Sequence, residues 1–273
     1  MFIFDVSLSP LIVRAFLASI FISLSVFGSS PFVAMRGLSF LVVEVAHAVL
    51  WGATLGILLN VVLGFPIDPI FSALLFAILS GLIAGYLGEK GMDIEIAIGS
   101  LFALNMALAV FLISIIPPSE LPKVWGLLIG DLLMLTQRDL GLLIVSSTVI
   151  VFLSVIFHRE MTYVSFDIEG AAAHGIRARF YHYLMVLIIS VATVVSVKAI
   201  GVILVYALMV LPGAISIRLS TSTLKMCVIS MIASLSSLFL GILISILTNI
   251  PPSGIVGIAL FVIYLIALKK SLR

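Results

Sequence analysis

Charged residues are scarce in this sequence. They make up 10% of its 273 residues, whereas hydrophobic residues make up 63%. A soluble domain carries roughly 25% charged residues, so this chain cannot cover its surface with polar groups in water. The shortage implies a lipid solvent, in which only helices and closed barrels satisfy their backbone polar groups. The apolar runs are long and continuous rather than short and alternating, so helices are predicted.

Cysteine is nearly absent, and an excess of one charge sign and enzyme motifs are missing. One cysteine, Cys227, excludes an internal disulfide and a metal site of several cysteines. The 14 Lys and Arg residues nearly balance the 12 Asp and Glu residues, so binding to nucleic acid is not expected. No G-x-x-x-x-G-K-[ST], H-E-x-x-H or G-x-S-x-G motif is present. The chain alone is therefore predicted neither to bind ATP nor to act as an enzyme.

Nine apolar segments are long enough to be transmembrane helices. They cover 8–27, 38–59, 70–87, 96–116, 140–157, 183–197, 202–217, 224–247 and 255–268. Breaks are expected at 28–31, at Gly201 and at Pro212. The segment 121–135 is expected to be re-entrant or interfacial, which leaves a range of eight to ten spans. The fold class is thus all-α, a polytopic membrane protein with one transmembrane domain over 1–273, in the bilayer of the plasma membrane.

Basic residues set the predicted orientation, because Lys and Arg accumulate in cytoplasmic loops. Lys269, Lys270 and Arg273 place the C-terminus in the cytoplasm. Counting back along the spans then places the polar segment 158–182 and Arg36 on the same side.

Glu44 and His47 lie in the middle third of the second predicted helix and share one face at i and i+3. A charge at the bilayer centre costs from about 2.5–3.5 kcal/mol. The two residues either hydrogen-bond to each other or to a neighbouring helix, or they hold a metal ion or a proton. Glu95 either complements the dipole of the fourth helix or lines a cation path. Asn105 is expected to hydrogen-bond between helices rather than to ligate, and is kept as a pathway candidate.

Two further pathway candidates flank the expected break at Gly201. Lys198 either extends to the membrane interface or pairs with a carboxylate near a transport path. Tyr206 follows the break and is predicted to belong to the core rather than to a polar lining.

The polar segment 158–182 contains a predicted short helix. Asp167 is placed as its N-cap, Glu169 falls in its first turn, and Gly175 is its expected C-terminal stop. This helix is either an ordinary connector or a docking element for a soluble partner. The candidate docking residues are Ser165, Phe166, Asp167, Glu169, Ala172 and Gly175.

Four stretches of the sequence resemble the permease subunits of zinc and manganese ABC importers. They are 35–39 with 47–56, 130–139, 165–176 and 199–214, so the resemblance extends over about 14–268. It implies a homodimer that works by alternating access, two ATPase subunits that dock on the loop helix at 167–175, and an extracellular metal-binding protein. It also implies that His47 is a ligand for transported Zn²⁺ or Mn²⁺ and that no cofactor is bound permanently.

The sequence departs from this family around the histidine. The family has an aspartate four residues before it, where this chain has Val43, so Glu44 is expected to substitute; Glu95 matches an acidic position of the family. Two alternatives stay open: a proton-coupled secondary transporter that uses Glu44 and His47, and an ABC permease for a chelated metal or cofactor. A membrane enzyme is the least favoured class.

Overall fold

The computed structural model describes residues 10–65 and 68–271, and all regular structure within these ranges is helical. The predicted start of the first span at residue 8 and the C-terminal Arg273 lie outside the described residues. The helices are α1 (Pro10–Met35), α2 (Ser39–Leu63), α3 (Pro69–Glu89), α4 (Ile94–Ile115), α5 (Leu121–Ile129), α6 (Gln137–Ile156), α7 (His158–Phe166), α8 (Ile168–Ala173), α9 (Ala178–Ile200), α10 (Val202–Leu219), α11 (Thr223–Thr248) and α12 (Pro252–Ser271), with 3-10 turns η1 (Pro118–Glu120) and η2 (Leu132–Met134).

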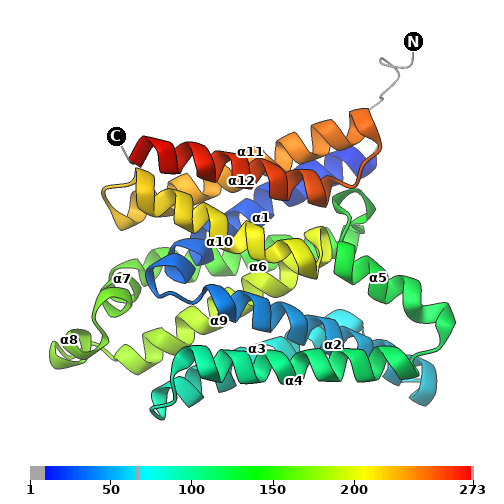
Figure 1. Cartoon of the computed structure of the whole chain (residues 1–273), viewed down its shortest axis with the longest axis horizontal. Helices are drawn as coiled ribbons and strands as arrows, with labels where there is room; N and C mark the ends of the chain where they lie inside the picture. The colour runs from blue at the N-terminus through cyan, green and yellow to red at the C-terminus, as the bar shows by residue number, and fades with distance from the viewer. Residues whose placement is uncertain (1–9, 66–67, 272–273) are drawn as a thin grey trace.

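Nine of the helices over the described ranges are long and apolar enough to cross a membrane, which confirms the predicted number of spans. They pack as two groups. In Figure 1, α10, α11 and α12 lie with α1 on one side, while α2, α3 and α4 lie on the other, and α6 and α9 run between them. The two most enclosed spans, α2 and α9, pack against each other where α2 meets the middle layer.

Basic residues gather at one end of the bundle, which we call the basic end. It carries Arg36, Lys90, Arg159, Arg177, Arg179, Arg218, Lys225, Lys269 and Lys270. The opposite end carries Arg14, Lys123, Arg138 and Lys198. The last three each form an ion pair with an acidic side chain, and Arg14 donates to backbone carbonyls. Unneutralised positive charge is therefore concentrated at the basic end.

The helix α5 does not span, as predicted for 121–135. Its nine residues reach only about 14 Å, less than half of the hydrocarbon thickness. It packs against α2, α9 and α10 at the opposite end, and Gly130 ends it with φ +65°. The backbone at Gly130 lies against the backbone at Gly201, where the predicted break between α9 and α10 is found with φ +84°. A side chain on either glycine would collide with the backbone of the other segment.

Two predicted breaks are wrong. The helix α1 continues through 28–31 to Met35, and α10 continues through Pro212 to Leu219. The small residues serve helix packing instead of turns. Ser154 of α6 donates to the Gly28 carbonyl at 2.9 Å, and Ser230 of α11 donates to the Pro212 carbonyl at 3.1 Å. Both bonds join neighbouring helices at these positions, so the glycine and the proline lie at helix contacts and do not end their helices.

Candidate functional site

The imidazole of His47 lies about a third of the way along α2, on a part-buried stripe between fully buried positions. The stripe consists of Val43, His47, Trp51 and Leu55, which recur at intervals of four residues. His47 Nδ1 lies 2.7 Å from the Val43 carbonyl oxygen, and because a carbonyl only accepts, Nδ1 is the donor. The ring also packs edge-on against Phe102 of α4, with centroids 4.9 Å apart. In the neutral ring these contacts leave Nε2 as the nitrogen with a free lone pair.

Glu44 is fully buried between α2, α3 and α4, and it meets Asn105 on the same side of α2 as Trp51. Ser80 of α3 donates to its Oε1, and Asn105 of α4 donates to the same oxygen at 2.8 Å. Trp51 donates in turn to Asn105 Oδ1 at 2.8 Å. Glu44 was predicted either to hydrogen-bond or to hold a metal ion or a proton, and the structure contains hydrogen bonds between Glu44 and both neighbouring helices. Asn105 forms the interhelical hydrogen bonds that were expected of it. We call these four side chains, Glu44, Ser80, Asn105 and Trp51, the α2–α4 polar cluster.

The candidate ligands Glu44, His47 and Glu95 do not meet in one chain. Asp93 caps α4 by accepting from the amides of Glu95 and Ile96, which places Glu95 exposed in the first turn at the basic end. Asn105, which contacts Glu44, lies about 15 Å further along α4. Within the described ranges, no group of three or more His, Cys, Asp or Glu side chains is close enough to hold a metal ion. A complete set of metal ligands therefore needs other groups in addition to these three side chains of one chain.

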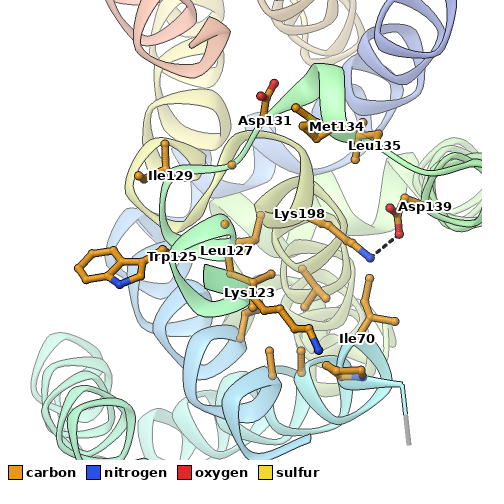
Figure 2. A pocket seen from close by; sticks show the side chains of 18 of the residues that line it. Ile70, Lys123, Trp125, Leu127, Ile129, Asp131, Met134, Leu135, Asp139 and Lys198 are labelled. Atoms are coloured by element: carbon orange, nitrogen blue, oxygen red, sulfur yellow. Dashed lines mark ion pairs between the residues drawn. The ribbon is translucent and has the colours of Figure 1, made fainter. Parts of the chain in front are cut away.

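A predominantly apolar cavity of about 590 Å³ lies under α5 at the opposite end, as Figure 2 shows. It is lined on α2 by Val49, Ala53 and Ile57, which lie on the side of the helix away from His47. The cavity is therefore separated from His47 by α2 itself.

Lys198, a pathway candidate, points along the wall of this cavity and forms an ion pair with Asp139 of α6. Of its two expected behaviours, pairing with a carboxylate is the one observed, while its part in a pathway stays a prediction. Tyr206 of α10 is 38% exposed, so its assignment to the core is wrong. The face of α10 that carries it points out of the chain together with Ile203, which is 67% exposed.

The predicted loop helix is present as α8, with Asp167 as its N-cap. The Asp167 carboxylate accepts from the Gly170 amide at 2.8 Å, and Gly175 follows the helix with φ +78°. Ala171 is buried, Ala172 and Glu169 are exposed, and the Ser165 hydroxyl is buried against α9 near Met185. Phe166 is 70% and Ile168 41% exposed beside α8, so two large apolar side chains are presented at the basic end.

Ser80 and Asp139 were not among the residues predicted for a site. Serine is common in these helices, so nothing in the sequence distinguishes Ser80 from the others. Asp139 follows Thr136 at the spacing of a capping box, and this helix-start signal explains its position but not its pairing with Lys198.

Comparisons with known proteins agree over nearly the whole chain. The family described as ABC 3 transport family matches residues 9–271. The manganese transport system membrane protein MntC of Listeria monocytogenes is 27% identical over 246 residues, covering 88% of this chain and 85% of that protein. An uncharacterized membrane protein of Cyanophora paradoxa is 31% identical over 263 residues, covering 94% and 86%. A chain in the solved structure of PsaBC from Streptococcus pneumoniae in complex with Fab has a TM-score of 0.82 at 25% identity, covering 95% of this chain and 91% of that one.

Proposed function

This chain belongs to the ABC 3 transport family, and from that premise we propose that it is the permease subunit of an ATP-driven importer of Mn²⁺ or Zn²⁺. The relatives named as manganese transport proteins support the cargo class. Imidazole and carboxylate ligands accept both ions, so the proposal names both.

The observation that carries this proposal is the state of His47. A histidine that binds a metal usually donates its other ring N–H to a carbonyl or carboxylate, which fixes the tautomer and orients the ring. His47 has this arrangement with the Val43 carbonyl, and its Nε2 is left for a ligand at mid-membrane depth. Val43 occupies the family's aspartate position, so the imidazole is the ligand that this stripe retains.

One imidazole is too few for a transition metal, and a second copy of the chain supplies another. The part-buried stripe of Val43, His47, Trp51 and Leu55 is the surface of α2 that a second copy would cover, which would bring two His47 rings to one axis. Glu44 would join the ligands only after giving up Ser80 and Asn105, and Glu95 would meet the ion near the basic end. Alternating access of the homodimer would expose this axis to each side in turn.

The basic end is assigned to the cytoplasm, because Lys and Arg accumulate on that side of membrane proteins. On this assignment the end of α12, the segment 158–182 and α8 would lie inside the cell. An ABC ATPase dimer would dock there on Phe166, Asp167 and Ile168, and an extracellular metal-binding protein would deliver the ion at the opposite end. The exposed apolar side chains beside a buried Ala171 suit a docking element that is anchored on one face and open on the other.

Metal uptake by the assembled transporter tests the proposal. The chain is purified with its ATPase, reconstituted in vesicles with the metal-binding protein, and given Mn²⁺ or Zn²⁺ with ATP. We expect His47→Ala to lower uptake at least about tenfold, the effect of losing one ligand contact worth about 1.4 kcal/mol.

The matched control is Leu55→Ala, which lies two turns along the same stripe and removes a side chain without ligand atoms. It should retain most of the uptake. Normal uptake by His47→Ala would show that His47 is not a ligand of the transported ion. Uptake driven by a proton gradient without the ATPase would show that the chain is a secondary transporter and not part of an ATP-driven importer.

A further inference from the structure

Arg36 lies in the turn between α1 and α2 and joins three elements at the basic end. Its Nη1 donates to the Val164 carbonyl in the last turn of α7, at 3.3 Å. Its Nη2 donates to His182 Nδ1 on α9, at 3.1 Å, so Nδ1 is the unprotonated nitrogen of that ring. The guanidinium thus connects the start of α2 to the end of α7 and the start of α9.

This contact is a costly way to hold the fold together. Arg36 Nε is buried without a hydrogen-bond partner, and no carboxylate pairs with Arg36 in the part of the chain that the structure describes. Burial also lowers the pKa of the guanidinium. Arg36 is thus a part-buried charge without a charged partner among the described residues, and charges taken out of water are normally paired. The contact therefore needs an explanation other than stability.

The end of α7 is rigidly connected to α8. Asp167 is the only residue between the two helices: its amide donates to the Tyr163 carbonyl of α7 at 3.0 Å, and its carboxylate accepts from Gly170 of α8. The Val164 carbonyl is one of the last carbonyls of α7, which have no partner within the helix and which a basic side chain can satisfy. Arg36 therefore contacts the segment that must move with α8.

Arg36 is joined to the start of α2 through the short turn at residues 36–38. The Arg36 amide donates to the Phe32 carbonyl and the Leu38 amide to the Val33 carbonyl, both at 3.0 Å, so the turn is closed against the end of α1. The helix α2 begins at Ser39, and His47 follows eight residues later, about 12 Å along the axis.

The imidazole of His182 brings α3 into the same contact. A Cβ added at Gly85 of α3 would lie 3.3 Å from His182 Nε2, so the ring is packed directly on the α3 backbone.

We propose that Arg36 is a positioning residue that transmits the movement of α8 to α2, through the Val164 carbonyl and His182, and so couples the partner ATPase to the helix that carries His47. The inference rests on the proposed function and extends it. Arg36 does not touch the transported ion. Its two terminal nitrogens, at fixed spacing, reach α7 and α9 at once, whereas a lysine would have to reach both acceptors from one nitrogen.

A second contact at the same end provides the control. Glu89 at the end of α3 accepts from the Tyr183 hydroxyl at 2.7 Å and pairs with Arg179, both on α9. This contact is exposed, and it does not include α7. Replacing Arg179 removes a positive charge at the same end without cutting the connection from α8 to α2.

The experiment measures metal uptake and ATP hydrolysis on the same vesicles holding the whole complex. We expect Arg36→Ala to lower metal transported per ATP hydrolysed at least tenfold while hydrolysis stays within twofold of the wild type. Arg36→Lys should give an intermediate ratio, and Arg179→Ala the ratio of the wild type. A wild-type ratio for Arg36→Ala, or a loss of the ratio by Arg179→Ala as well, would overturn the proposal.

A second readout does not depend on the cargo. Hydrogen exchange of residues 37–47 is followed in the full complex with and without a non-hydrolysable ATP analogue. The wild type should show an analogue-dependent change that His182→Phe abolishes and His182→Gln, which retains an acceptor, preserves. His182→Phe with the wild-type change would contradict the proposal even if Arg36→Ala did not assemble. Absence of metal uptake by the wild type, with the exchange change intact, would instead count against the proposed cargo.

Discussion

Lys198, in the last turn of α9, forms an ion pair with Asp139 in the first turn of α6, on the wall of the cavity under α5 (Figure 2). Asp139 is buried, whereas the Lys198 side chain is 36% exposed. The Asp139 carboxylate also accepts from the amide and the hydroxyl of Thr136, at 3.0 and 2.7 Å. The pair therefore connects α9 to the start of α6 beside the break at Gly201.

Lys198→Met should destabilise the protein by about 1–3 kcal/mol, less than for a fully buried pair because the lysine is partly solvated. The double variant Lys198→Met with Asp139→Asn should lose less than the sum of the two single variants, because the unpaired charge is then absent. Thermal unfolding of the four proteins in detergent gives the coupling energy. Additive losses would mean that the two side chains contribute independently.

Asn105→Leu should destabilise the protein by about 1–3 kcal/mol, because it leaves a buried Glu44 oxygen and the Trp51 N–H with one partner fewer. Ser114→Ala on the same helix is the control, since Ser114 is exposed and bonds only to its own helix. Equal melting temperatures for Asn105→Leu and Ser114→Ala would show that the α2–α4 polar cluster does not hold these helices together.

Gly201→Ala should prevent the protein from accumulating in folded form. The residue has φ +84° and ψ +160°, a region open almost only to glycine, where a Cβ costs about 1–3 kcal/mol, and that Cβ would also collide with the backbone of α5 at Ile129. Gly99→Ala is the matched control, because a Cβ at Gly99 in α4 meets nothing within 4 Å. Yield and size-exclusion profile in detergent compare the two, and a folded Gly201→Ala protein would contradict the tight contact between α5 and the α9–α10 break.

His158 should make stability depend on pH. In the folded protein, burial lowers the pKa of this imidazole below its ordinary value of 6.5. Its Nε2 lies 2.9 Å from the Thr223 hydroxyl, within hydrogen-bonding distance. The unfolded chain then binds the proton more readily, so the contribution is complete above pH 6.5 and is lost as pH falls through the folded pKa. The melting temperature of the wild type should therefore fall from pH 7.5 towards acid more steeply than that of His158→Gln. Parallel curves would assign the acid sensitivity to other groups.

Phe166→Ala should weaken binding of the ATPase by about tenfold if α8 is its docking element, since exposed aromatic side chains dominate such contacts. Met134→Ala, at a residue 75% exposed near the opposite end, should leave the affinity unchanged. Binding of the purified ATPase to each variant in nanodiscs measures this. An unchanged affinity for Phe166→Ala would place the docking surface elsewhere.

Local signals in the sequence were sufficient for the spans and for α8. Long apolar runs decide which segments enter a bilayer, and Asp167 and Gly175 mark the two ends of α8 by capping chemistry that needs only near neighbours. The same local reasoning was wrong at Gly28 and Pro212, because a glycine or proline in a membrane helix ends it only when no neighbouring helix makes use of it.

The direction of Glu44 could not be derived from its spacing with His47. Both residues lie on one broad face of α2, but the face divides between neighbours: Ser80 and Asn105 draw the carboxylate inwards, while the imidazole stays on the part-buried stripe. Likewise, nothing in the order of residues brings Arg36 to Val164 and His182, which are more than a hundred positions away.

By itself, the sequence determined that this chain crosses a membrane about nine times as helices. Its composition suits a lipid solvent, and in hydrocarbon the backbone N–H and C=O groups must bond to each other, which helices achieve within one segment. The tertiary structure alone decided which polar side chains meet. In hydrocarbon, an unpaired polar group is costly wherever it lies, but its partner is chosen by how the helices cross and not by distance along the chain.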